Sequence, residues 1–154
     1  MFSKYLIFTA FCLYLASCGD SSELVKVNIE RITLKSFPNT KTDGSSWDDG
    51  ISIEQMKPDV YVQVVSGGAV IGSSGVYQDQ ASPNNLPFDD DYLITEMNAG
   101  ISFQFFDKDI ALDDQIGTVT IFPRKLHEDS EGALLHTISE NNIEFDIIAA
   151  YTEE

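Results

Sequence analysis

From residue 24 onward, apolar and polar residues alternate in short runs that are separated by Gly, Asn, Asp and Pro. Because successive side chains of a β-strand point to opposite faces, this period of two predicts strands with one buried face. No segment carries an apolar helical stripe over three turns, although residues 53–56 could form one short turn. The pattern predicts an all-β, eight-stranded antiparallel β-sandwich. The eight expected strands are 24–37, 59–65, 69–77, 91–97, 101–106, 116–122, 134–138 and 143–151.

The first expected strand contains a change of phase. Val25, Val27 and Ile29 alternate on one face, whereas Ile32 and Leu34 continue the alternation one residue out of step. An extra residue in one strand of a pair produces such a shift. We therefore expect a β-bulge near the middle of this strand.

Residues 1–17 have the properties of an export signal. Lys4 precedes an apolar run, 5–15, which is shorter than the roughly 20 residues that cross a bilayer as a helix. The run ends in Leu15-Ala16-Ser17-Cys18, an order that resembles a bacterial lipobox. This resemblance implies a lipoprotein signal peptide over 1–17, diacylglyceryl and palmitate modification of Cys18, a lipidated tether over 18–23, and an extracytoplasmic location on the cell membrane or outer membrane. The alternative is an ordinary signal peptide that contains a cysteine.

The charge balance restricts the partners that the chain can bind. The sequence has 25 Asp and Glu against 9 Lys and Arg, so its formal net charge is −16. Nucleic-acid phosphates require clustered cations, and anionic lipid attracts basic patches. We therefore expect no nucleic-acid partner and no membrane contact through basic residues alone.

Two expected loops are rich in aspartate. Asp43, Asp48 and Asp49 precede Asp59 in the first loop, and the second loop runs from Asp107 to Gly117. Carboxylates that are brought together repel one another, and a divalent cation relieves that repulsion. Ca²⁺ accepts six to eight oxygen ligands in irregular geometry, whereas zinc and iron favour His or Cys, which both loops lack. The loops therefore predict a calcium site.

The order of these motifs resembles that of a C2 domain. An apolar strand leads into an Asp-bearing loop, which is followed by D-x-Y-V; an apolar strand ending in D-x-D then leads to D-x-[IFL]-G. The corresponding residues are Asp59-Val60-Tyr61-Val62, Asp107-Lys108-Asp109 and Asp114-Gln115-Ile116-Gly117, while Pro83 to Asp89 is similar to the family's N-P-x-W-N-E segment. The resemblance implies a C2-like domain over 24–154, with its extra strand at the carboxyl end and its calcium ligands in apical loops.

Carried over position by position, the resemblance implies five metal ligands. They are Asp48, Asp59, Asp107, Asp109 and Asp114, and either Asp43 or Asp49 could replace Asp48 because the first loop is long. Three further residues are possible apical contacts. Ile110 and Leu112 could touch lipid or could pack the second loop down, and Trp47 could be a contact or a lid over the sandwich end.

Two functions remain open at this level. The first is a calcium-dependent module that binds phospholipid or a surface protein, and the second is a calcium-independent structural or interaction lipoprotein that uses the sandwich as a scaffold. We do not expect an enzyme, because His127 and His136 lie far from any nucleophile motif and the segment 72–75 lacks the G-x-S-x-G spacing.

Overall fold

The computed structural model of the chain describes residues 23–48, 50, 52–129 and 134–154. The expected signal peptide (1–17), Cys18 and Asp49 lie outside these residues, so the expectations about them are not tested. Within the described part, no helix has the length and apolar character needed to cross a bilayer.

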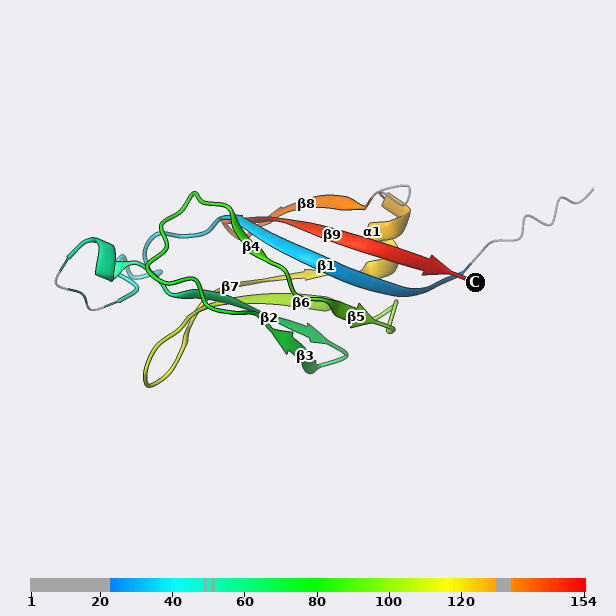
Figure 1. Ribbon diagram of the computed structural model, residues 1–154, viewed down its shortest axis with the longest axis horizontal. Coiled ribbons are helices and arrows are strands. Elements are labelled where there is room, and N and C mark those ends of the chain that lie inside the picture. The colour runs from blue at the N-terminus through cyan, green and yellow to red at the C-terminus, as the bar shows by residue number, and fades with distance from the viewer. Residues whose placement is uncertain (1–22, 49, 51, 130–133) are drawn as a thin grey trace, which may run out of the picture.

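The described residues form two antiparallel sheets that pack face to face (Figure 1). One sheet has the order β4-β1-β9-β8, with β5 also paired to β1, and the other has the order β3-β2-β6-β7. The expected all-β antiparallel sandwich is therefore present. Its strands are β1 (Leu24–Ser36), β2 (Val60–Ser66), β3 (Ala69–Ser73), β4 (Leu86–Phe88), β5 (Tyr92–Ile94), β6 (Ile101–Asp107), β7 (Asp114–Ile121), β8 (Leu135–Glu140) and β9 (Ile143–Glu153).

The described residues contain nine strands rather than the eight expected, and they contain a helix where a loop was expected. The additional strand, β4, has only three residues and includes Pro87. Proline has no backbone N–H, and an edge strand tolerates it where that position faces solvent rather than a neighbouring strand. The helix α1 (Pro123–Asp129) begins at proline, a residue whose fixed φ suits the first helical position. Both elements are too short to produce a periodic signal. The 3₁₀ turn η1 (Glu54–Met56) occupies the place where one short turn was expected.

Strand β1 contains the expected bulge. Its pairing with β9 shifts register between Ile29 and Arg31, so that Ile29 and Ile32 both point inward and are fully buried. The two sheets meet around three phenylalanines, Phe103 and Phe105 of β6 and Phe145 of β9, whose ring centroids lie 5.1 and 5.3 Å apart across the interface. The sequence has two cysteines, Cys12 and Cys18, so residues 24–154 hold together by this core without a disulfide.

Strand register brings the two acidic loops to the same end of the sandwich. Val60, at the start of β2, pairs with Asp107 at the end of β6, and Asp107 also pairs with Asp114 at the start of β7. The long connection that carries η1 and the loop between β6 and β7 both extend from this end (left in Figure 1). We call this end the apex.

Candidate metal centre

Asp107 occupies an inward-facing position of β6, where the other inward-facing residues are apolar. Along β6 the buried side chains are Ile101, Phe103, Phe105 and then Asp107, because alternate residues point into the core. Asp107 is fully buried, and its Oδ1 accepts a hydrogen bond of 2.7 Å from the backbone N–H of Asp59. Its Oδ2 is buried with no hydrogen-bond partner among the described residues. A buried oxygen with no partner costs free energy unless another group satisfies it.

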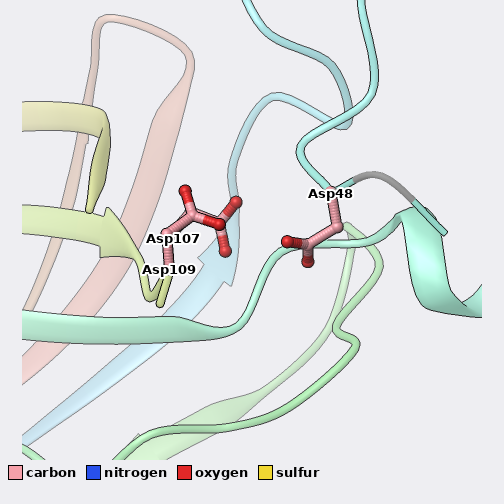
Figure 2. Close-up of side chains that lie close together, drawn as sticks. All are labelled: Asp48, Asp107 and Asp109. Atoms are coloured by element: carbon pink, nitrogen blue, oxygen red, sulfur yellow. The ribbon is translucent and has the colours of Figure 1, made fainter. Parts of the chain in front are cut away.

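Asp48 and Asp109 direct their carboxylates toward Asp107, as Figure 2 shows. One oxygen from each of the three residues lies within 4.8 Å of the others. Asp109 follows the end of β6, and its backbone N–H donates to Oδ1 of Asp113 at 3.1 Å. Asp48 arrives from the long first loop, about sixty positions away in the sequence. We call Asp48, Asp107 and Asp109 the carboxylate cluster.

Asp59 borders the carboxylate cluster but is not part of it in the described structure. One of its carboxylate oxygens accepts a hydrogen bond from the backbone N–H of Asp79 at 2.8 Å, while its carbonyl accepts one from the N–H of Lys108 at 2.8 Å. Its charge still raises the pKa values of Asp48 and Asp107. Asp59 is therefore close enough to contribute charge to the site.

Asp114 was expected to be a ligand, but in the described structure it lies outside the carboxylate cluster. Its carboxylate forms an ion pair with Lys41, a residue that the sequence analysis did not single out. Asp43, which was an alternative to Asp48, accepts hydrogen bonds from the N–H and Oγ of Ser45 at 2.9 and 2.6 Å and stabilises a local turn.

Asp113 and Asp79 are two further residues that the sequence analysis missed. Asp113 accepts hydrogen bonds from Tyr61 Oη at 2.7 Å and from Lys108 Nζ at 3.0 Å, which fixes the second loop against β2. Asp79 lies with Asp48 and Asp59 on the wall of a solvent-open hollow of about 810 Å³ at the apex. Neither aspartate belongs to a motif. For Asp113, the one available signal was its place directly before Asp114, an expected ligand.

Two exposed apolar residues of the second loop, Ile110 and Leu112, line the hollow. Ile110 is fully exposed and Leu112 is 80% exposed, so these two residues do not pack the loop down. Trp47, in contrast, is only 6% exposed, and its indole N–H donates to the carbonyl of Pro38 at 2.9 Å. Trp47 therefore offers little surface for a contact at the apex. It is a lid that closes the end of the core, because its ring is large and apolar and its N–H finds a local acceptor.

Burial and mutual repulsion raise the pKa values of two members of the cluster, Asp107 and Asp48. Burial raises the pKa of Asp107 to about 6, and the charges of Asp48 and Asp109 act in the same direction. Burial, followed by the charges of Asp109 and Asp59, also raises the pKa of Asp48. Each shift means that ionising the carboxyl group of Asp48 or Asp107 costs more free energy in the folded protein than in the unfolded chain.

The donor set fits a hard divalent cation. All three side chains of the cluster carry carboxylate oxygens, and one of the two on Asp107, Oδ2, has no hydrogen-bond partner among the described residues. Within the described residues, both histidines lie elsewhere, on α1 and β8. Oxygen donors in an irregular loop site suit Ca²⁺ better than Mg²⁺, which requires near-octahedral geometry. Asp48, Asp107 and Asp109 would hold the ion, with room in the hollow for water ligands.

These pKa shifts predict how stability depends on pH when calcium is absent. The pKa of Asp107 is higher in the folded protein than in the unfolded chain, so the folded state binds more protons between the two values. The free energy of unfolding should therefore fall by about 1 kcal/mol between about pH 5 and pH 7. The lowered pKa values of Asp43, Asp113 and Asp146 act in the opposite direction, but only at lower pH.

Urea unfolding in a chelating buffer at several pH values measures this dependence. Asp107→Asn should remove most of the slope between about pH 5 and pH 7, because it removes the titrating group. Asp91→Asn, which removes a charge from an exposed position, serves as the control and should leave the slope unchanged. A wild-type protein that gains stability over this range would contradict the prediction.

Comparison with solved structures identifies the fold. The chain is similar to a solved C2 domain (TM-score 0.54, 14% identity, covering 82% of this chain and 97% of that one). It is also similar to a C2 domain of plant Extended Synaptotagmin 1 (TM-score 0.52, 9% identity, 86% and 98% covered). A third similar structure is the calcium-bound pair of C2 domains from Extended-Synaptotagmin 2 (TM-score 0.50, 17% identity, 84% and 46% covered). No protein-family model matches the sequence, and no curated protein matches it. The sandwich is thus a C2-like fold, with its acidic cluster in the apical loops.

Proposed function

We propose that this chain is a calcium-dependent binding module whose apex engages a phospholipid surface. The observation that carries the proposal is the buried carboxylate of Asp107, whose Oδ2 lacks a partner among the described residues and which lies close to the carboxylates of Asp48 and Asp109. A divalent cation satisfies that oxygen and relieves the repulsion among the three groups. The C2-like fold supports the same reading, because one similar structure is described as calcium bound.

Calcium controls the approach of the apex to a surface. Without the ion, the carboxylate cluster and Asp59 repel an anionic membrane, in a chain whose net charge is −16. With the ion bound, much of that local charge is neutralised. The exposed Ile110 and Leu112 can then enter the interfacial region of the lipid, where burial of apolar surface is favourable. Ile53, beside η1, is 77% exposed and adds a third apolar side chain on the other apical loop.

Vesicle co-sedimentation tests this function. The purified protein should sediment with phosphatidylglycerol vesicles in calcium and remain in the supernatant with chelator. An affinity for calcium in the range of about 10⁻⁴ to 10⁻³ M would suit an extracytoplasmic module. Equal sedimentation with and without calcium would overturn the proposal. It would favour a calcium-independent scaffold that binds another protein.

The anchoring of the module is a separate proposal. We infer that Cys18 is lipidated and that the chain is held on the extracytoplasmic side of a bacterial membrane. Glu23, the last tether residue, pairs through its backbone with Glu154, at the end of the sandwich opposite the apex (Figure 1). A domain that stands upright on this tether presents its apex away from the membrane that holds the anchor. The apex is then free to engage a second surface.

Metabolic labelling with palmitate tests the anchor. Label should enter the wild-type protein and be lost in Cys18→Ala, because the substitution removes the sulfur of the lipobox cysteine that would be acylated. Cys12→Ala is the matched control, since it removes the other cysteine but leaves Cys18, and it should keep the label. Label that survives in Cys18→Ala would overturn the anchor without affecting the calcium site.

A further inference from the structure

We propose that the ammonium group of Lys41 occupies the place of a second cation at the apex, so that the site takes one Ca²⁺ rather than two. This inference rests on the proposed function, because it assigns the number of ions that the same site holds. Lys41 is the residue that sets this number. It does so by holding Asp114, which would otherwise be available as a ligand.

The first observation is the ion pair between Lys41 and Asp114. Asp114 is the position that the C2-like motif Asp114-Gln115-Ile116-Gly117 offers as a ligand, yet its carboxylate faces an ammonium group instead of the carboxylate cluster. Lys41 lines the same hollow as Asp48 and Asp109. The ammonium group of Lys41 thus lies within the acidic site at the apex. It is paired with Asp114, the expected ligand that is absent from the carboxylate cluster.

The second observation is that Lys41 is fixed in this position. Its Nζ lies 5.9 Å from the centroid of the Trp47 ring. That ring is buried in the core, and its N–H donates a hydrogen bond to the carbonyl of Pro38. An ammonium group at this distance from an indole is attracted to the ring face. The backbone of Lys41 is held as well, because its N–H donates to the carbonyl of Ser45 at 3.0 Å and its carbonyl accepts from the N–H of Gly44 at 2.9 Å. The side chain is therefore presented to Asp114 by a formed turn and a buried ring.

The third observation concerns the charges at the apex. Lys108 pairs with Asp113 and lies over the ring of Tyr61, so it neutralises a carboxylate that holds the loop. Lys41 neutralises Asp114 in the same way. The carboxylates that remain in close contact are Asp48, Asp107 and Asp109, and the buried Asp107 oxygen is among them. Three converging carboxylates match a single doubly charged ion.

The charge of Lys41 persists through the neutral range. Asp114, and after it Asp109 and Asp107, raise its pKa above the ordinary value of a lysine. A bound Ca²⁺ near Asp109 will repel this ammonium group, so Lys41 also limits the affinity of the one ion that binds. The side chain therefore behaves as a permanent internal cation.

The test is a calcium titration by calorimetry and by equilibrium dialysis on three forms of the purified protein. Wild type should bind one Ca²⁺ per chain. Lys41→Met removes the charge but keeps a long side chain against Trp47, and it should bind two. Lys108→Met is the matched control. It removes the same charge from the same end, but it frees Asp113 rather than Asp114, so it should bind one.

A further variant checks the route to the second ion. Lys41→Met with Asp114→Asn should return to one ion, because the freed carboxylate is gone. Circular dichroism of each variant, compared with wild type, verifies that the fold is retained.

The possible outcomes separate this inference from the proposed function. One ion in both wild type and Lys41→Met overturns the role of Lys41 and leaves the calcium module intact. Two ions in wild type also overturn the role of Lys41. No ion in wild type overturns both the calcium-dependent function and this inference, because the inference assigns one ion to the wild-type site.

Discussion

Calcium should raise the midpoint of thermal unfolding of the wild-type protein by roughly 10 °C when its concentration exceeds the dissociation constant about a hundredfold. An ion that binds only the folded state stabilises it by about 2.7 kcal/mol under that condition, and 1 kcal/mol moves the midpoint of a domain of this size by several degrees. The unfolded chain lacks the site, because Asp48 meets Asp107 and Asp109 only after folding. Differential scanning fluorimetry in calcium and in chelator measures the shift.

Asp107→Asn should abolish this shift and should also stabilise the protein in chelator. The asparagine oxygen can keep the hydrogen bond from the N–H of Asp59, while its amide group can donate to the carboxylates of Asp48 and Asp109. The substitution therefore removes a buried charge that costs free energy without calcium, and it removes the ligand that calcium needs. The two effects have opposite signs in the two buffers, which a merely structural role for Asp107 would not produce.

The matched control for this experiment is Asp91→Asn. Asp91 is exposed, and its Oδ1 is 3.4 Å from the side-chain amide of Asn28, on the sheet away from the apex. This variant should show the full calcium shift and little change in chelator. If the wild-type protein unfolds at the same temperature in calcium and in chelator, the carboxylate cluster does not bind the ion.

The second large effect is expected at the surface of the apex. Replacement of Ile110 and Leu112 by serine should lower the calcium-dependent affinity for phosphatidylglycerol vesicles by roughly a hundredfold. Full burial of one such side chain contributes about 1.5–3 kcal/mol, so partial burial of two contributes close to the 2.7 kcal/mol that a hundredfold represents. The measurement is vesicle binding as a function of lipid concentration at saturating calcium.

Calcium binding itself should survive this change. The side chains of Ile110 and Leu112 project into solvent and supply no oxygen to the cluster, so the thermal shift caused by calcium should remain. Leu134→Ser with Leu135→Ser is the matched control, because these leucines are 60% and 59% exposed and lie directly before and at the start of β8, the end of that strand that points away from the apex. Unchanged vesicle affinity in the Ile110 and Leu112 variant would show that the apex meets its target by another route.

The strands and the position of Asp107 could be read largely from the sequence. The period of two is a local property of an extended backbone, and it places Asp107 in phase with Ile101, Phe103 and Phe105. The phase change in the first strand predicted the bulge that the register of β1 and β9 contains. Strand β4 and helix α1 escaped prediction because three and seven residues are too few to establish a period.

The membership of the cluster depended on contacts between distant segments. The motif placed Asp114 among the ligands, whereas in the structure its carboxylate pairs with Lys41, 73 positions away in the sequence, and lies outside the cluster. Trp47 could have been a contact or a lid, and only its packing against the core decided between them. For Ile110 and Leu112, full or nearly full exposure shows that they do not pack the loop down.

The sequence by itself determined that the strands within residues 24–154 alternate apolar and polar residues, as in an antiparallel sandwich. It also placed two acidic loops at the ends of those strands. Both properties follow from the direction of side chains along a single extended segment. Tertiary structure alone decided that Asp48, Asp107 and Asp109 share one site while Lys41 holds Asp114. The physical reason is that a long loop has many conformations of similar local energy. Packing of Trp47, a backbone turn and the balance of charge at the apex select one of them.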